Sequence, residues 1–263
     1  MTSTDRQTLA ARNNALWCDA VARSHGVTGT FDETAWACPT RTPPYYPDVV
    51  TLSPDAEEYD LLARIDDSDG CSVKDSWDRL DLSLEDFARI VVGEWVWLDP
   101  TSALPDAGSA LPDANSDTEH TGDTGDTRAW RRVTSPAGMS AWVTAWSSDP
   151  EAAGILRATL LDEPGVHVLA AYAGGEDGIQ GRSAAGGSRV VAGGILHVTG
   201  EVAGLGNLFA QDGDHRRTWR EAAGAAREIA AGIPLVGWEA GAGLEAALAA
   251  GCEKVGPLTV WLK

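Results

Sequence analysis

Basic residues are scarce in this sequence. Its 263 residues include 20 Lys and Arg against 39 Asp and Glu, which gives a formal net charge of −19 at pH 7. A nucleic-acid backbone or an anionic membrane attracts a positively charged protein face, and no basic stripe in the chain provides one. We therefore expect neither a nucleic acid nor a membrane as partner, and the acidic surface favours a cationic partner such as an amine.

Cysteines are few and widely separated. The four are Cys18, Cys38, Cys71 and Cys252, which form no Cys-x-x-Cys pair and do not cluster with the five histidines. A disulfide framework or a zinc site needs such groupings, so the sequence predicts neither, and no residue is assigned as a metal ligand. Unpaired cysteines fit the reducing cytoplasm.

Long hydrophobic runs are also missing. No segment approaches 18 consecutive apolar residues, and residues 1–7 are not followed by the apolar core of a signal peptide. We expect a cytoplasmic protein without a membrane span. The sequence also lacks the Gly-x-Ser-x-Gly, His-Glu-x-x-His and P-loop motifs, so it gives no signature of a serine hydrolase, a zinc peptidase or a P-loop nucleotidase.

The first 92 residues predict an N-terminal extension that is helical and irregular. Apolar periodicity indicates helices near residues 6–26, 53–65 and 83–92. Residues 40–47, Thr-Arg-Thr-Pro-Pro-Tyr-Tyr-Pro, contain three prolines, which are incompatible with a regular helix. We expect an extended, turn-rich path there, with Tyr45 and Tyr46 as packing groups.

A domain spanning residues 93–263 follows, with an unusual acidic insert at about residues 99–127. The insert has seven acidic residues, no Lys or Arg and few large apolar groups, so it cannot bury enough surface to offset its ordering entropy. We predict a disordered loop. The Trp-rich strands on its two sides, residues 94–98 and 128–132, are predicted to pair as one hairpin, and a second flexible loop is predicted at 174–188.

The C-terminal part has the clearest pattern of elements. We expect a helix over residues 135–146, a strand over 166–173, and a hairpin of two strands with its turn near Thr199 and Gly200. A helix is then predicted to start at Thr218, because its apolar residues fall on one face. A short strand, a short helix that Gly251 ends, and a final strand complete the chain.

This order, with the phrase Ala249-Ala-Gly-Cys-Glu-Lys-Val-Gly256 between the last helix and the last strand, resembles the C-terminal half of the GCN5-related N-acetyltransferase family. The resemblance covers residues 93–263 and is clearest over 166–262. It implies an α/β fold with a mixed, mainly antiparallel sheet flanked by helices. It also implies acetyl-coenzyme A as cofactor and an amine as acceptor.

The family's signature is an Arg/Gln-x-x-Gly-x-Gly/Ala turn between its fourth strand and the next helix, whose backbone N–H groups hold the coenzyme pyrophosphate. Residues 211–217 here, Gln-Asp-Gly-Asp-His-Arg-Arg, have one Gly and depart from that pattern. The resemblance implies that the pantetheine arm runs along Asn207, Leu208 and Phe209. It also implies that the pyrophosphate lies near His215, Arg216, Arg217 and Thr218.

A structural alternative exists for the same turn. Thr218 and Glu221 have the spacing of a capping box, which would occupy the free N–H groups of the helix start. Asp212 and Asp214 would also oppose a bound anion. The sequence therefore leaves open a coenzyme site and a self-capped helix start.

Two residues are candidates for proton transfer. In the family a Glu often accepts the amine proton, and Glu239, at the end of the strand before the last helix, is the best-placed candidate here. The Tyr that often protonates the departing thiolate has no counterpart near residues 241–251, and Cys252 is the nearest alternative donor. A buried packing role for Cys252 and a solvated role for Glu239 are the competing interpretations.

Two classes of function follow. The first is an acyl-coenzyme A-dependent N-acyltransferase acting on a small-molecule amine. The second is a catalytically inactive binding or accessory protein that keeps the fold while its coenzyme turn has eroded. The sequence identifies neither the acceptor nor the oligomeric state.

Overall fold

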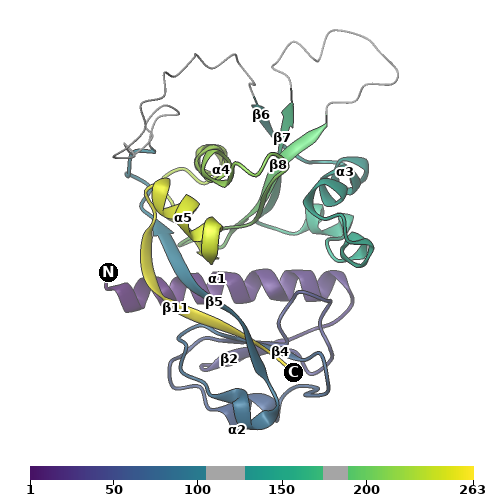
Figure 1. The fold of residues 1–263 in the computed structure, drawn as a ribbon, viewed down its shortest axis with the longest axis vertical. Coiled ribbons are helices and arrows are strands. Elements are labelled where there is room, and N and C mark those ends of the chain that lie inside the picture. The colour runs from purple at the N-terminus through teal and green to yellow at the C-terminus, as the bar shows by residue number, and fades with distance from the viewer. Residues whose placement is uncertain (105–127, 174–188) are drawn as a thin grey trace, which may run out of the picture.

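The computed structural model describes residues 1–104, 128–173 and 189–263, without the side chains of residues 150 and 151. Within them, eleven strands form one mixed sheet in the order β1-β2-β3-β4-β11-β5-β10-β9-β8-β7-β6. Figure 1 shows β6, β7 and β8 at one end of the molecule and β2 and β4 at the other. The strands are β1 Thr30–Phe31, β2 Ala35–Ala37, β3 Val49–Thr51, β4 Ser72–Asp75, β5 Ala88–Leu98, β6 Arg128–Arg132, β7 Val166–Ala173, β8 Val190–Val198, β9 Ala203–Ala210, β10 Leu235–Glu239 and β11 Glu253–Leu262.

Helices cover both faces of this sheet. They are α1 Ser3–Ser24, α2 Glu58–Leu62, α3 Pro136–Trp146, α4 His215–Ile229 and α5 Gly241–Ala249, with 3-10 turns η1 Leu82–Glu85, η2 Pro150–Gly154 and η3 Ala158–Asp162. Side chains alternate along the strands: Ile195 of β8 packs with α1 and α3, whereas Leu196 packs with α4 and α5. The fold class predicted from the sequence is confirmed. No helix among the described residues is long and apolar enough to cross a membrane.

The predicted order of the C-terminal elements is also confirmed. The β8/β9 hairpin, the helix α3 capped by Ser135, and the succession of β10, α5 and β11 all occur. One boundary differs, because α4 begins at His215 with Asp214 as its N-cap. The predicted capping box at Thr218 is therefore wrong: Thr218 lies inside the helix, buried, and its hydroxyl accepts from Arg128.

The predicted hairpin between residues 94–98 and 128–132 is wrong. β5 lies between β10 and β11, antiparallel to both, whereas β6 pairs with β7 at the far edge of the sheet. Sequence adjacency suggested local pairing, but the long apolar strand β5 gains more burial in the middle of the sheet. Residues 105–127 of the predicted disordered insert, and the predicted loop 174–188, lie outside the described residues.

The N-terminal extension contains more β-structure than the sequence indicated. β1 to β4 belong to the same sheet as the rest of the chain, and the helix predicted over residues 53–65 is reduced to α2. The helix predicted over 83–92 is wrong, because η1 gives way to β5 at Ala88, where the run Ile90-Val91-Val92 favours a strand. β5 also runs across the predicted domain boundary at residue 92, so the division into two domains stays a prediction.

Two buried amides attach α1 to the sheet. Gln7 donates through Nε2 to the carbonyl of Ser76 (2.7 Å), and Asn13 donates through Nδ2 to the carbonyl of His197 (2.9 Å). A Cβ atom at Gly204 would lie 1.9 Å from Asn13 Oδ1, so only glycine allows this close approach. The position of α1 across the sheet is thus set by specific polar contacts as well as by apolar packing.

We expect Asn13→Ala to lower the free energy of unfolding by about 1–3 kcal/mol, because it removes the hydrogen bonds that the buried Asn13 amide donates to the His197 carbonyl and the Thr199 hydroxyl. Urea unfolding followed by circular dichroism measures this change. Thr8→Ala, at an exposed site on the same helix, should stay within about 0.5 kcal/mol of the wild type. Equal effects of the two substitutions would contradict the anchoring role of Asn13.

Candidate active site

The sheet opens between β9 and β10. These parallel strands pair only at Leu235 with Ala203 and at Val236 with Gly204. Further along, a register shift against β8 marks a bulge in β9, where Asn207 has a left-handed φ of 52°. Beyond Gly204, peptide groups of β9 therefore face a gap instead of a neighbouring strand.

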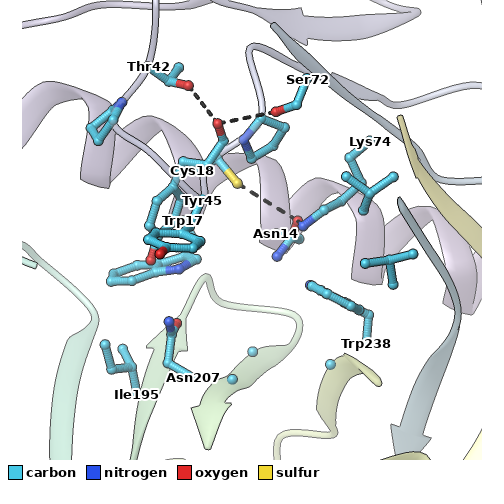
Figure 2. Close-up of a pocket in the computed structure, with 18 of the residues that line it drawn as sticks. Asn14, Trp17, Cys18, Thr42, Tyr45, Ser72, Lys74, Ile195, Asn207 and Trp238 are labelled. Carbon is cyan, nitrogen blue, oxygen red and sulfur yellow. Dashed lines mark hydrogen bonds between the residues drawn. The ribbon is translucent and has the colours of Figure 1, made fainter. Parts of the chain in front are cut away.

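A cavity of about 1190 Å³ lies at this opening. Figure 2 shows α1 on one side of it and the ends of β9 and β10 on the other. Its lining combines aromatic and proline side chains with a few polar groups, among them Asn14, Trp17, Cys18, Pro43, Pro44, Tyr46, Lys74, Trp95, His197, Asn207, Leu208, Trp238 and Glu239. A mostly apolar cavity with few polar groups is typical of a small-molecule site.

The proline-rich segment 41–47 forms one wall of the cavity. Asp48, 1% exposed, fixes this wall by accepting from Arg41 Nη1 (2.9 Å), from the Thr42 N–H (2.8 Å) and from the Ser72 N–H (3.0 Å). Tyr46 packs inward as expected. Tyr45 does not, because it is 69% exposed at a left-handed φ of 68°, and its hydroxyl donates to Asp149.

Lys74 is a buried charged group in the cavity lining. It is 5% exposed, its Nζ donates to Asn14 Oδ1 (2.9 Å), and it lies 4.7 Å from the ring centre of Trp238. Burial lowers the pKa of its ammonium group. The alternation of side chains along β4 explains why Lys74 lies in the cavity. Val73 and Asp75 face away from α1, so Lys74, between them, faces toward it.

Trp17, Tyr46 and His197 line the opposite side. The rings of Trp17 and His197 have centres 6.1 Å apart, and those of Trp17 and Tyr46 are 6.2 Å apart. Burial lowers the pKa of His197, which favours the neutral imidazole, and its Nδ1 has no hydrogen-bond partner within residues 1–104, 128–173 and 189–263. Burial also raises the pKa of the Tyr46 hydroxyl, so this wall carries no net charge near neutral pH.

Glu239 stands at the end of β10, where the strands have separated. Its Oε1 accepts from Trp219 Nε1 of α4 (3.0 Å). A Cβ atom at Gly243 of α5 would lie 2.3 Å from its Oε2, so glycine leaves room for the carboxylate. Burial raises the pKa of Glu239 to about 7, which is the range suited to a general base at neutral pH.

Cys252, the other predicted catalytic residue, is buried at the start of β11. Burial and the nearby Glu239 raise the pKa of its thiol to about 12. A thiol with so high a pKa is a weak proton donor, and its packing among residues of α4 and α5 agrees with the structural interpretation.

The turn before α4 is occupied by its own carboxylates. Asp214 accepts from the Arg217 N–H (2.9 Å), and Asp212 accepts from the Asp214 N–H (3.0 Å). Two guanidinium groups at this turn have carboxylate partners. Arg128, whose side chain is 1% exposed, pairs with Asp212, and Arg217 pairs with Glu221. The positive end of the helix is thus already neutralised.

Acetyl-coenzyme A, which the resemblance implies, fits this site only in part. The unpaired edge of β9 beyond Gly204 suits the amide groups of a pantetheine arm. The turn does not suit a pyrophosphate in the arrangement seen, because Asp212 and Asp214 already accept from N–H groups of the turn and the first helical turn.

The predicted site residues therefore fall into four places, of which the packing of Cys252 among residues of α4 and α5 is one. Asn207, Leu208 and Glu239 line the cavity, whereas Phe209 packs edge-on against Trp142, with ring centres 5.1 Å apart. The first turn of α4 is formed by the remaining predicted residues, His215, Arg216, Arg217 and Thr218.

The sequence reasoning missed Lys74, Asn14, Trp238 and Arg128. A single Lys or Arg in a short strand normally faces solvent, so no pattern in the sequence marked Lys74 and Arg128 as buried.

Comparison with known proteins agrees with this architecture. No protein-family model and no curated protein sequence matches the chain. A GCN5-related N-acetyltransferase from Kribbella flavida matches in structure with a TM-score of 0.56 at 10% identity, over 97% of this chain and 95% of that one. A functionally unknown conserved protein from Staphylococcus epidermidis ATCC 12228 matches with a TM-score of 0.54 at 11% identity, over 89% of this chain and 92% of that one. The chain has the fold of the GCN5-related N-acetyltransferases.

Proposed function

We propose that this protein is an N-acyltransferase that transfers an acyl group from a coenzyme A thioester to a small-molecule amine. The observation that carries the proposal is the meeting of a large aromatic cavity with the gap between β9 and β10. One substrate can lie in the cavity on the α1 side, and the thioester can reach it through the gap.

The donor supplies an activated acyl group. The chain supplies an edge for its arm at Asn207 and Leu208, and a carboxylate, Glu239, that accepts the proton of the attacking amine. A carboxylate with a pKa of about 7 is largely ionised just above neutral pH and still basic enough to take that proton. The cavity walls limit access of water to the amine.

The self-capped turn supports a second candidate function. If Asp212 and Asp214 exclude the pyrophosphate, the same cavity belongs to a binding or accessory protein without acyl transfer. The two candidates differ in one measurable property, the binding of acetyl-coenzyme A.

Calorimetric titration with acetyl-coenzyme A tests the proposal. We expect binding at millimolar or lower concentration, and we expect Arg216→Ala combined with Arg217→Ala to weaken it about tenfold, because two guanidinium groups near the phosphates are lost. Arg131→Ala combined with Arg132→Ala removes the same charge from exposed positions on β6 and should leave affinity unchanged. Absence of binding to the wild type at millimolar coenzyme would refute acyl transfer and favour the accessory role.

Asp214→Ser refines this test. Serine is a good N-cap, so helix α4 keeps its start while the negative charge disappears. The variant should bind acetyl-coenzyme A more tightly than the wild type. Unchanged affinity would mean that the Asp214 carboxylate does not compete with the coenzyme.

A further inference from the structure

Lys74 brings an amino group into the cavity lining that no acidic side chain in the described part of the chain neutralises. Its Nζ has one hydrogen bond, to Asn14 Oδ1, and one contact with a ring face, that of Trp238. Across the described residues, no carboxylate forms an ion pair with it. An ammonium group has three donors, so part of its hydrogen-bonding capacity remains available to the cavity.

The groups that face Lys74 are neutral. Asn14 and Cys18 face it from α1, and burial raises the pKa of the Cys18 thiol to about 11, so that this sulfur stays protonated. Trp238 faces it from β10, and Ile90, Val91 and Val260 of the neighbouring strands β5 and β11 complete the apolar lining. No negative charge from these elements compensates the ammonium.

The nearest acidic residues along the strands point elsewhere. Asp75, next to Lys74 on β4, turns to the other face and accepts from the N–H groups of Trp77, Arg79 and Leu80. Glu239, next to Trp238 on β10, contacts Trp219 on the α4 side. A buried cation without a charged partner is costly, so its retention beside a large cavity needs a reason.

We propose that Lys74 receives the carboxylate of a ligand, and that the acyl acceptor is an amine that also carries a carboxylate and an apolar or aromatic body. The identity of the ligand as acceptor rests on the proposed function, whereas the carboxylate site itself does not. The aromatic walls formed by Trp17, Tyr46, Trp95 and Trp238 accommodate the body. Although the net charge of −19 favours a cationic partner, the charged side chain buried against Trp238 in this cavity is a lysine.

This arrangement also orients the acceptor. The Trp238 ring lies under the Lys74 ammonium, and the next residue of β10 is Glu239, at the opening of the sheet. A ligand held at Lys74 by its carboxylate can extend along β10 toward that opening, where the amine would meet the thioester. Trp238 and Asn14 thus act as positioning residues for Lys74.

Benzoate and benzamide provide a matched pair of probes, because they share an aromatic ring and differ in charge. Without coenzyme, we expect millimolar benzoate to raise the melting temperature of the full chain and to bind in calorimetry, and we expect benzamide to do neither. Lys74→Met should weaken benzoate binding at least tenfold. Lys254→Met, at an exposed lysine on β11, should bind benzoate as the wild type does.

The outcomes separate clearly. Equal responses to benzoate and benzamide, no response to benzoate, or undiminished benzoate binding by Lys74→Met would each overturn the carboxylate site. If Lys74→Met fails to fold, the titration of Lys74 can be followed in the wild type by the ¹³C resonance of its side chain. Benzoate should raise the pH at which Lys74 titrates. An unchanged titration would refute the site. Benzoate binding without acetyl-coenzyme A binding would refute only the proposed acyl transfer.

Discussion

Glu239→Gln should lower the turnover of acyl transfer by roughly 10²–10⁴ while leaving acetyl-coenzyme A affinity almost unchanged. The amide keeps the shape of the side chain and can still accept from Trp219 Nε1, but it cannot take a proton from the amine. Release of free thiol from acetyl-coenzyme A in the presence of carboxylate-bearing amines measures the rate. In the wild type, that rate should rise with pH through about 7, as Glu239 ionises.

The same substitution should change stability in a pH-dependent way. The folded protein keeps the Glu239 proton up to a pH of about 7, whereas the unfolded chain loses it near the ordinary value of 4.5. Between these values the folded state binds more protons, so wild-type stability falls as pH rises, and the loss is complete above pH 7. Glu239→Gln should therefore match the wild type at acidic pH and exceed its stability at pH 8 by on the order of 1–3 kcal/mol.

Glu245→Gln supplies the control for both measurements. Glu245 lies exposed on α5, six residues after Glu239 in the chain and outside the cavity lining, so its neutralisation should alter neither the rate nor the pH dependence of stability. A Glu239→Gln variant with wild-type turnover would exclude Glu239 as the base. A gain in stability at pH 8 without a loss of turnover would mean that burial alone explains its raised pKa.

The sequence predicted the C-terminal half of the fold well because the signals there are local. The β8/β9 hairpin follows from a short turn between two apolar runs, and the apolar face of α4 follows from its periodicity. Strand order is not local. β5 joins β10 and β11, which follow it by more than a hundred residues, and nothing in its own sequence specifies those partners.

The candidate site was predictable only where a resemblance supplied positions. Glu239, Asn207 and Leu208 were found because the succession of strand and helix placed them at the opening of the sheet. Lys74 and Asn14 come from β4 and α1, segments that the sequence described as extension, and they meet only because α1 crosses the sheet. Burial of a polar side chain in this way depends on tertiary packing, which local pattern does not report.

Replacing residues 99–127 by a four-residue turn should strongly destabilise the protein. If the flanking strands paired as the predicted hairpin, such a short turn could still connect them. β5 and β6 are separated in the sheet by β10, β9, β8 and β7, a distance of about 24 Å at the usual strand spacing. Four of the five pairs from β5 to β6 are antiparallel and one, β9 with β10, is parallel, so β5 and β6 run in the same direction. The end of β5 and the start of β6 therefore also lie at opposite edges along the strand direction.

A link of four residues spans at most about 18 Å, so the shortened chain cannot keep both strands in place. Loss of β6 removes its ladder with β7 and the buried contacts of Arg128 with Thr218 and Asp212, which together should cost more than about 4 kcal/mol. Thermal and urea unfolding measure this loss.

A Gly/Ser linker of native length in place of residues 105–127 is the control, because residues 99–104 keep their contacts with Arg227 and the span stays within reach. A four-residue variant as stable as this control would refute the observed strand order. If both variants lost the same free energy of unfolding, the amino-acid composition of the segment, and not its length, would be what the fold requires.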